Sequence, residues 1–381
     1  MNRIKILEMI DKPFIGGGQR HLLSLVKSLD KTRFDVSVSS AGGGPLEEAV
    51  LKEGIPHTAI PIQKRLNKQS VNFLVPLLKK NDYDIIHTHG GVAGLFGRWA
   101  ARKAHTPVIV HTLHGIHYFH YRNPWNRWFS VKLERFFSQF TSALIFVSDA
   151  DRQQGQKHRL APEDKMHTIQ NGIDFAAVSS MRLSRKEILT AKKDLGLHKD
   201  SPIIGTIARL HRQKGLIYLL KSMVYVRQEY PSARLIIIGD GPEKEKLLQE
   251  ASNLSIQDCV LFLGEQKDAS RFLSVFDIFA LSSLWEGLPY VLMEAAAFEK
   301  PVVATRIDGV KEMVSHEKTG LLVPPRDSFS LGQTLLRMLK ETDFAEGLGK
   351  KLYERSSLSF PLTKMVTKIQ DLYFDLYEKY R

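Results

Sequence analysis

Short runs rich in β-branched and other apolar residues alternate with helical patterns about three turns long in the first half of the chain. The runs lie at 4–9, 34–39, 58–60, 85–88, 108–112, 143–147 and 166–169, and the helical patterns between them include 19–29, 71–79, 92–104 and 125–137. This alternation is typical of a parallel β-sheet covered by helices on both faces. It therefore predicts an α/β domain.

The same pattern starts again after a polar, weakly patterned stretch at 175–200. The second set of strand-like runs lies at 203–208, 234–238, 260–263, 278–282 and 301–305. We predict two doubly wound, Rossmann-like domains that face a central cleft, because ligands bind at the carboxyl ends of such strands. The first domain would take residues 1–174 and the second 175–362, with the aromatic-rich helix at 363–381 packing back on the first.

The composition allows each of two domains to bury its own core. The 381 residues are 43% hydrophobic and 25% charged, and no apolar run approaches the length that spans a bilayer. The first residues, MNRIKILEMID, indicate a first strand rather than a signal peptide. One cysteine, Cys259, cannot form an internal disulfide or a cysteine-rich metal site, which fits a reducing cytoplasm. The net charge of +13 calls for an anionic partner, whether nucleotide, membrane surface or nucleic acid.

Two carboxylates eight residues apart, Glu286 and Glu294, flank the start of a predicted helix. Along an unbroken helix they would lie about 12 Å apart, too far for one small chemical group to bridge. Gly287 frees the backbone and Pro289 suits the first helical position. Glu286 is therefore expected on a loop, and Glu294 about a turn and a half inside the helix, whose N-terminus attracts phosphate. The pair suits a nucleotide sugar, and the alternative is an ordinary loop and helix with surface acids.

Basic residues and a glycine turn follow two of the second-domain strands. Arg209 and Lys214 come directly after the run at 203–208, where an Arg fork and a Lys point charge are placed to neutralise a diphosphate. The next run ends at Gly239 and Gly241, and such a turn lets the backbone approach a ligand closely. Solvated surface charges are the alternative for the basic pair, and the G-x-G pattern alone is weak evidence. Their order along the chain, ahead of the two glutamates, favours a nucleotide-sugar site.

This array of motifs resembles the retaining glycosyltransferases of family 4, which have the GT-B fold. The motifs that carry the resemblance are Gly205, Arg209, Lys214-Gly215, Gly239-Asp240-Gly241-Pro242, Phe276-Asp277, Glu286-Gly287-Leu288-Pro289, Glu294-Ala295, Gly320-Leu-Leu-Val-Pro324 and Asn171-Gly-Ile-Asp174. The resemblance extends from Gly16 to about Asp327. Each piece is common, but the combination is highly specific.

The resemblance implies a role for each matching residue. Arg209 and Lys214 would hold the donor diphosphate and stabilise the leaving group as negative charge develops. Glu294 would accept hydrogen bonds from the ribose hydroxyls, and Glu286 would contact hydroxyls of the transferred sugar. The implied catalytic residues are His114, Arg209, Lys214 and Glu286, and the implied donor-binding residues are Gly17, Gly18, Gly239, Gly241, Leu288, Pro289, Tyr290, Val291 and Glu294. The amides near Tyr290 would cap a phosphate.

The resemblance also implies that neither a metal nor another cofactor is needed, because the basic pair neutralises the diphosphate. Two Asp-x-Asp triplets are present, Asp82/Asp84 and Asp149/Asp151. Both fall at element boundaries in the first domain, where capping or solvation explains them better than metal binding.

The acceptor side is expected in the first domain. Gly16-Gly17-Gly18 follows the first strand, and it is either a plain tight turn or, as the resemblance implies, a loop that reaches toward donor phosphate or acceptor. Gln19 stands where family members often carry Glu.

Four histidines at a spacing of three begin at the end of the fifth strand: His111, His114, His117 and His120. That spacing suits a helix or suggests a metal, but the strand-to-loop context and Gly115 argue against a helix, and an isolated histidine here would be a satisfied core residue. By resemblance to the family's His-Gly loop, His114 lies near the reacting sugar. We assign it to positioning and polarisation, because retaining members have no clear protein nucleophile.

Six aromatic residues fall within 118–129, interleaved with arginines and histidines. This composition suits a membrane interface, and core packing is the alternative. A basic cluster in the same domain favours a peripheral membrane enzyme on the inner face of the cell membrane; its members are Lys64, Arg65, Lys68, Lys79 and Lys80. No nucleic-acid motif is present, so nucleic acid is not an expected partner.

The leading hypothesis is a retaining glycosyltransferase that moves a sugar from a nucleotide diphosphate sugar to a saccharide or lipid-linked acceptor in cell-surface polysaccharide, lipopolysaccharide or glycolipid synthesis. Uridine is the base that the family implies. Two alternatives stay open: a nucleotide-sugar epimerase on the same fold, and a membrane or nucleic-acid binding module with a vestigial site. A dinucleotide oxidoreductase is weaker, because the glycine triplet lacks the G-x-G-x-x-G spacing.

Overall fold

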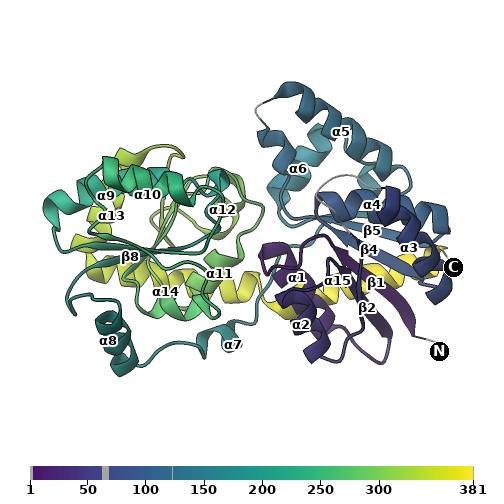
Figure 1. Ribbon diagram of the computed structural model, residues 1–381, viewed down its shortest axis with the longest axis horizontal. Coiled ribbons are helices and arrows are strands. Elements are labelled where there is room, and N and C mark those ends of the chain that lie inside the picture. The colour runs from purple at the N-terminus through teal and green to yellow at the C-terminus, as the bar shows by residue number, and fades with distance from the viewer. Residues whose placement is uncertain (1–2, 62–67, 122, 381) are drawn as a thin grey trace. The chain divides into compact units, whose positions relative to one another are not determined.

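The computed structural model describes residues 3–61, 68–121 and 123–380, which form two compact units (Figure 1). Unit 1 comprises Met1–Gly172 and Leu362–Arg381, and unit 2 comprises Ile173–Pro361. Each unit is a parallel sheet with helices packed on it. The predicted fold class, two doubly wound α/β domains, is confirmed.

Unit 1 has a seven-stranded parallel sheet in the order β3-β2-β1-β4-β5-β6-β7. Its strands are β1 (Ile4–Ile10), β2 (Phe34–Ser40), β3 (His57–Ala59), β4 (Ile85–His89), β5 (Val108–Leu113), β6 (Ala143–Phe146) and β7 (Met166–Thr168). Its helices are α1 (Gly17–Ser28), α2 (Pro45–Lys52), α3 (Lys68–Asn81), α4 (Gly91–Ala104), η1 (His117–His120), α5 (Pro124–Ser138), α6 (Asp149–Lys157), η2 (Glu163–Lys165) and α15 (Leu362–Tyr380). The strand order reverses between β1 and β4, and the carboxyl ends of strands at such a switch point are where ligands bind.

The side chains of β1 alternate between two covered faces, as the period of two in a strand requires. Ile4 and Ile6 pack in a core that includes residues of α15, such as Ile369. Leu7 and Met9 pack on the opposite face with α3 and α4. Glu8 lies an even number of residues from Ile4 and Ile6, so its side chain points to the same face of the sheet, which the C-terminal helix covers.

Unit 2 has a six-stranded parallel sheet in the order β10-β9-β8-β11-β12-β13. Its strands are β8 (Ile203–Ile207), β9 (Arg234–Ile238), β10 (Val260–Phe262), β11 (Ile278–Leu281), β12 (Val302–Thr305) and β13 (Leu321–Val323). Its helices are α7 (Phe175–Ser179), α8 (Arg185–Asp194), η3 (Arg212–Lys214), α9 (Leu216–Glu229), α10 (Lys244–Asn253), η4 (Ala269–Ser274), α11 (Tyr290–Ala297), α12 (Asp308–Met313), α13 (Ser328–Lys340) and α14 (Thr342–Ser359). The order again reverses beside its first strand, between β8 and β11.

Two helices lie in the stretch at 175–200 that the sequence pattern left unassigned. α8 begins with a capping box in which the Ser184 hydroxyl accepts from the Glu187 amide and the Glu187 carboxylate accepts from the Ser184 amide. Asp174 is the N-cap of α7, and its carboxylate accepts from the Ala177 amide. These short helices are stabilised at their first turns rather than by a strong apolar stripe, so periodicity did not reveal them. Periodicity also missed β13, which is three residues long.

Candidate functional site

A partly buried ion pair forms the centre of the predicted donor region in unit 2. Lys214 Nζ lies 2.5 Å from Glu286 Oε1, and the two side chains are 18% and 8% exposed. Ser283 Oγ donates to the same carboxylate oxygen over 2.7 Å, and Gln213 Nε2 donates to Oε2 over 3.3 Å. We call this group, together with Arg209, the Lys214 site. It holds Glu286 in one orientation through three donors from two different loops.

Glycines bring these loops close to neighbouring backbone. Gly215 has φ +58°, and a Cβ there would lie 2.2 Å from the Ser282 carbonyl oxygen. Gly239 and Gly241 have φ +128° and +159°, and a Cβ on them would lie 2.2 and 2.4 Å from carbonyl oxygens of the loop after β8. All three positions require glycine, because both the backbone angle and the contact exclude a side chain. The predicted glycine turn therefore packs against the basic loop.

Arg209 carries the accessible positive charge of the Lys214 site. Its side chain is exposed, and among the described residues it has no hydrogen-bond or ion-pair partner. A guanidinium in this position can bind a phosphate without first breaking an internal ion pair. Lys214, by contrast, must share its charge with Glu286.

The loop after β11 leads directly into α11, which begins at Tyr290. We predicted Pro289 as the first helical residue. It is instead the N-cap, so the helix begins one residue later than predicted. Leu288 is buried ahead of it, and Val291 lies in the first turn. Glu294 is buried in the following turn. The amide end of α11 and this carboxylate thus lie on the segment that also carries Glu286, as expected from the spacing.

Gly309 explains why α12 begins with Asp-Gly. A Cβ at Gly309 would lie 1.4 Å from the Gly287 carbonyl oxygen. The two backbones therefore touch, and only glycine fits at this point. The Asp308 position starts the helix and leaves this contact intact.

In unit 1, the second predicted group comes together at the carboxyl ends of β1 and β5. α1 begins at Gly17, with Gly16 as its N-cap, so Gly17 and Gly18 form the first helical turn and not the loop we predicted. A Cβ on Gly18 would lie 3.2 Å from Cδ2 of His114. Gln19 accepts from the Gly16 amide and donates to the Lys12 carbonyl, so it holds the glycine segment in place.

His114 is part of a hydrogen-bonded network that the sequence did not reveal. His89 Nδ1 lies 3.1 Å from His114 Nε2, and His89 Nε2 lies 2.7 Å from Glu8 Oε2. Tyr373 of α15 donates to Glu8 Oε1 over 2.6 Å and also contacts His87. We call these five residues, with His21 beside them, the histidine network. Its members come from five separate segments: α1, β1, β4, the loop after β5, and α15.

Burial sets the charge state of the histidine network. Burial lowers the pKa of His89 to about 4 and, with the charge of His89, that of His21 to about 3. Burial, with the neighbouring His21, also holds the pKa of His114 well below its usual range. Burial alone would raise the pKa of Glu8, but the charge of His87 and hydrogen bonds from His87 and His89 lower it well below its ordinary value. The network is therefore a carboxylate surrounded by donors, with neutral imidazoles at its edge.

The other three histidines of this segment do not join the network. His111 points to the opposite face of the sheet, where its ring contacts the Thr88 hydroxyl and carbonyl. His117 and His120 are exposed on a short 3₁₀ helix. We expected no helix at the four histidines. This expectation is wrong for His117 and His120, although their 3₁₀ helix is too short to align all four rings.

The two Asp-x-Asp triplets have structural roles. Asp149 and Asp151 lie in the first turn of α6, where the Ser148 hydroxyl accepts from the Asp151 amide. Asp84 accepts from the Lys5 amide over 2.8 Å, and Asp82 has φ +53° in the preceding turn. Acidic residues in a first turn complement the helix dipole.

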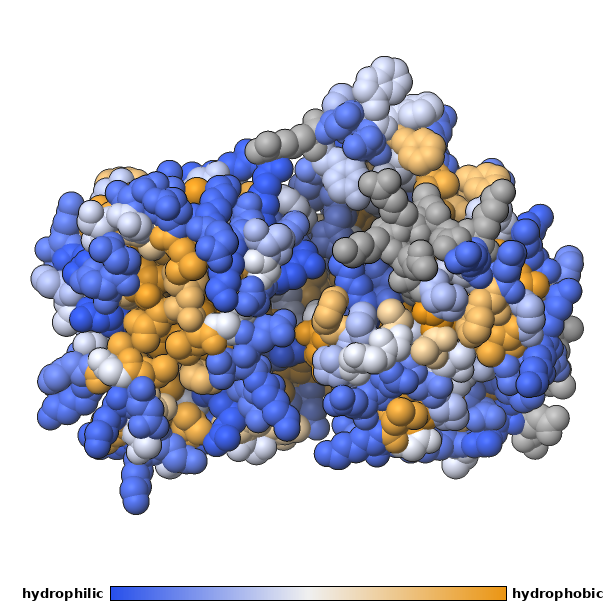
Figure 2. All heavy atoms as spheres, viewed as in Figure 1, coloured by the Kyte–Doolittle hydropathy of each residue, from blue (hydrophilic) through white to orange (hydrophobic). Residues whose placement is uncertain are grey.

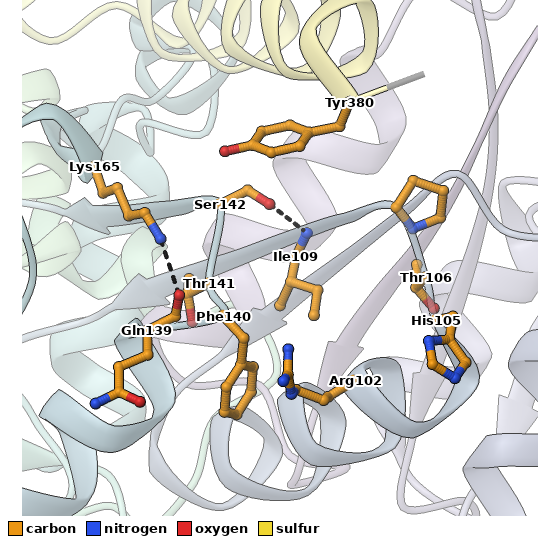
Figure 3. A pocket seen from close by; sticks show the side chains of 11 residues that line it. Arg102, His105, Thr106, Ile109, Gln139, Phe140, Thr141, Ser142, Lys165 and Tyr380 are labelled. Atoms are coloured by element: carbon orange, nitrogen blue, oxygen red, sulfur yellow. Dashed lines mark hydrogen bonds between the residues drawn. The ribbon is translucent and has the colours of Figure 1, made fainter.

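A cavity of about 320 Å³ lies in unit 1 at the amino ends of β5 and β6 (Figure 3). Arg102, Phe140 and Tyr380 line it, and Lys165 crosses one side to donate to the Gln139 carbonyl. The cavity is at the opposite ends of the strands from His114. None of the predicted site residues lines it.

α5 presents an aromatic face to the surface. Trp125, Trp128, Phe129 and Phe136 are 75%, 56%, 58% and 56% exposed, and with Lys132 they recur at helical spacing on one side. Hydrophobic side chains mixed with hydrophilic ones are visible over this helix in Figure 2. We call this the α5 face. Core packing, one of our two interpretations of 118–129, is wrong for the residues on this face but holds for Tyr118 and Phe119, which pack against a core cluster of unit 1. Of the predicted basic cluster, Lys79 and Lys80 are exposed at the end of α3, whereas Lys64, Arg65 and the Lys68 side chain lie outside the described residues.

Within the described ranges, no helix combines the length and apolar character needed to cross a membrane.

Two family models match consecutive parts of the chain. The model for Glycosyltransferase Family 4 matches residues 15–177. The model for Glycosyl transferases group 1 matches residues 187–355. The two ranges contain every predicted site residue.

Similar proteins cover most or nearly all of the chain. UDP-Gal:alpha-D-GlcNAc-diphosphoundecaprenol alpha-1,3-galactosyltransferase of Escherichia coli is 28% identical over 382 residues, with 98% of each chain covered. N-acetyl-alpha-D-glucosaminyl L-malate synthase of Bacillus anthracis is 26% identical over 306 residues, with 80% of this chain and 77% of that protein covered. The crystal structure of Anabaena HepE in complex with UDP-glucose superposes with a TM-score of 0.86 at 23% identity, covering 97% of this chain and 99% of that one. This structural likeness shows the GT-B fold.

Proposed function

The chain belongs to the group 1 glycosyltransferases of family 4, and on that premise we propose that it transfers a hexose from a UDP-sugar, with retention, to a lipid-linked saccharide. Glycosyltransferase membership confirms the resemblance drawn from the motifs. Uridine, retention and the acceptor class are the proposed parts. The E. coli relative supports uridine and the acceptor class, because its name specifies a UDP-sugar and a diphosphoundecaprenol-linked acceptor.

The observation that carries the proposal is the Lys214 site. The side chain of Arg209 is exposed and unpaired among the described residues, and Lys214 follows five positions later in the same connection after β8. Two cations on one loop suit a diphosphate, which gains negative charge as it leaves. Glu286 is held by three donors, so its remaining acceptor capacity is oriented for sugar hydroxyls.

In the proposed reaction, the bond between the anomeric carbon and the diphosphate oxygen breaks as the acceptor hydroxyl oxygen bonds to that carbon on the same face. The hydroxyl proton passes to the departing diphosphate. Arg209 and Lys214 stabilise the leaving group, and Glu294 binds the ribose. His114 positions the sugar or the acceptor and forms no covalent bond.

Transfer assays with a panel of nucleotide sugars test the proposal. A UDP-hexose should raise the melting temperature, because a ligand at one hundred times its dissociation constant stabilises a protein by about 2.7 kcal/mol. Mass spectrometry should then show one hexose added to a diphospholipid-linked sugar, with UDP released. Conversion of the donor without any acceptor would instead identify an epimerase and overturn the proposal.

Arg209→Gln should reduce transfer by roughly 10²-fold, because one preorganised charge on the leaving group is lost. Arg227→Gln is the matched control, since Arg227 of α9 forms a partly exposed ion pair with Asp258. Equal activity in both variants would contradict the role given to the Lys214 site.

We also propose that turnover needs no divalent metal, because the two basic side chains supply the positive charge at the diphosphate. Excess chelator should leave the rate of transfer unchanged. A loss of activity that added Mg²⁺ or Mn²⁺ restores would contradict this part.

The α5 face supports a peripheral membrane enzyme. Exposed tryptophans suit the headgroup region, and Lys132, whose ammonium lies 5.7 Å from the Trp128 ring centre, suits an anionic lipid surface. We place this surface on the cytoplasmic side, in keeping with the single cysteine. A lipid-linked acceptor would then be met at the bilayer, whereas the malate named for the B. anthracis relative would require no such surface.

Vesicle co-sedimentation tests the membrane proposal. The protein should bind vesicles that contain anionic phospholipid at low salt and dissociate at high salt. Trp125→Ala/Trp128→Ala should weaken this binding. The matched control is Phe329→Ala, which removes an exposed aromatic ring that lies in unit 2 and not on the α5 face. Binding that ignores lipid charge and the tryptophans would remove the membrane role but leave the transfer reaction intact.

A further inference from the structure

The histidine network contains a linear path of hydrogen bonds that ends at His114. Tyr373 donates to one oxygen of Glu8, and His89 Nε2 lies 2.7 Å from the other. The second nitrogen of His89 lies 3.1 Å from His114 Nε2, and the two rings stack at 21° with 5.3 Å between centres. Glu8, His87 and His89 are fully buried, so water does not compete for these bonds.

Only one arrangement of protons satisfies this path. The Glu8 carboxylate is ionised and accepts, so His89 must carry its proton on Nε2. His89 is neutral, so its Nδ1 is a bare acceptor. His114 must then donate from Nε2, and because it is also neutral its Nδ1 is left unprotonated.

Residues from every neighbouring element hold this arrangement. His87 Nδ1 lies 3.3 Å from Glu8 Oε2, and its other nitrogen lies 2.7 Å from the Thr112 hydroxyl. On the α1 side, His21 Nδ1 lies 3.0 Å from Asn171 Oδ1 and its ring meets the edge of His114 with 4.9 Å between centres. The Asn171 oxygen is an acceptor, so His21 carries its proton on Nδ1 and donates it to Asn171.

We infer that Glu8 and His89 are positioning residues that fix His114 in the Nε2-protonated form and so present its bare Nδ1 as a hydrogen-bond acceptor for a substrate hydroxyl. His114 is only partly buried, and its Nδ1 has no hydrogen-bond partner in the described part of the chain. A hydroxyl donates to such a nitrogen, whereas a carboxylate or carbonyl is repelled by it. The site at His114 therefore selects a hydroxyl of the sugar or acceptor; its role in turnover rests on the proposed function.

The ring-nitrogen signals of His114 in nitrogen-15 NMR spectra test the inference without any assay of activity. Wild-type protein at neutral pH should show His114 protonated on Nε2 and bare on Nδ1. In Glu8→Gln, the amide can donate to His89 Nε2, which moves the His89 proton to Nδ1 and drives His114 to the opposite tautomer. Glu47→Gln is the matched control, because Glu47 pairs with the buried His57 ring over 3.2 Å elsewhere in unit 1. That control should leave the His114 signals unchanged.

Kinetics then separate positioning from folding. Glu8→Gln and His89→Gln should each lower kcat/KM by roughly 10- to 100-fold while nucleotide binding to unit 2 is retained. Tyr373→Phe keeps the Glu8 charge and removes one donor, so it should lower kcat/KM by less than either. If His114 has the predicted tautomer but the protein transfers no sugar, the proposed function fails and the proton arrangement stands.

Three results would overturn the inference. One is a wild-type His114 that carries its proton on Nδ1. Another is Glu8→Gln with native tautomer and native kcat/KM. The third concerns metal, because Glu8, His87 and His89 are the one group of three potential metal ligands among the described residues whose ligand atoms all lie within 4.8 Å of one another. One equivalent of bound metal in the purified protein, found by elemental analysis, would replace the proton network with a metal centre.

Discussion

The Lys214 site of unit 2 and the histidine network of unit 1 both lie at the carboxyl ends of parallel strands, but they handle charge in opposite ways. The Lys214 site keeps formal charges near the surface, with Arg209 exposed and Lys214 paired to Glu286. The histidine network buries one carboxylate among hydroxyl and imidazole groups and leaves His89 and His114 neutral. The first arrangement suits a ligand that brings its own charge, and the second suits neutral hydroxyls.

This difference predicts that the two units respond differently to acid, and this is the largest effect we expect. His21 and His89 have pKa values of about 3 and 4, against 6.5 when unfolded. The unfolded chain therefore binds more protons below about pH 6.5, so the stability they provide is present above that pH and is lost as pH falls toward the folded pKa values. When the pH falls from about 7.5 to 5, each imidazole should lower the free energy of unfolding of unit 1 by on the order of 2 kcal/mol.

Hydrogen exchange read by mass spectrometry at both pH values measures each unit separately. Unit 2 is the internal control, because its three histidines, at 198, 211 and 316, are exposed or only partly buried. If acid reduced protection from hydrogen exchange equally in both units, the buried neutral imidazoles of unit 1 would not be the cause of the destabilisation.

The second prediction concerns Lys214, whose charge serves both Glu286 and the proposed diphosphate. Lys214→Met should lower kcat by roughly 10²- to 10³-fold, because a leaving-group charge is lost and Glu286 is left without its cation. Glu286→Gln keeps the shape and most hydrogen bonds of the carboxylate, so it should lower kcat less. Steady-state kinetics with thermal unfolding as a fold check measure both. If Glu286→Gln proves the more damaging change, the carboxylate and not the lysine carries the chemistry.

The sequence predicted these two regions unequally, and the reason is how their residues are spaced. Lys214, Glu286 and the glycines fall in short contiguous motifs on loops, so their order along the chain was visible. Glu8 and His89 are single polar residues in apolar strands, and no local pattern links them. The available signal was the alternation of side chains along each strand. By this alternation, Glu8 shares a sheet face with Ile6, and His89 shares it with Ile85; the C-terminal helix covers this face.

Secondary structure followed the same rule. Long periodic elements such as β1 and α4 were predictable from the spacing of apolar residues, since burial on one face sets that spacing. The short helices α7 and α8 depend on caps at Asp174 and Ser184. The Ser184–Glu187 spacing is a recognisable capping box, so α8 was within reach of the sequence, whereas the seven-strand order of unit 1 was not.

The third prediction concerns a glycine of the Lys214 site. Gly215→Ala should destabilise unit 2 by roughly 2–4 kcal/mol, because alanine is strained at φ +58° and its Cβ would lie 2.2 Å from the Ser282 carbonyl oxygen. Urea unfolding measures the loss. Gly196→Ala is the control: it has φ +69° but no atom within 4 Å of the added methyl group, so it isolates the backbone strain. Equal losses in the two variants would show that the contact with Ser282 does not matter.

The smallest effect is expected at the corresponding glycine of unit 1. Gly18 lies in the first turn of α1, where alanine is favoured by about 1 kcal/mol over glycine. The added methyl group would lie 3.2 Å from His114 Cδ2 and 3.3 Å from Ile10 Cδ1, so the ring must move by a few tenths of an ångström. The gain and the crowding should nearly cancel in stability, while kcat/KM falls a few-fold because the His114 acceptor nitrogen is displaced. Denaturant unfolding and kinetics on the same sample separate the two. Unchanged kinetics would mean that the position of His114 tolerates such a shift, and that the first turn of α1 does not help to set it.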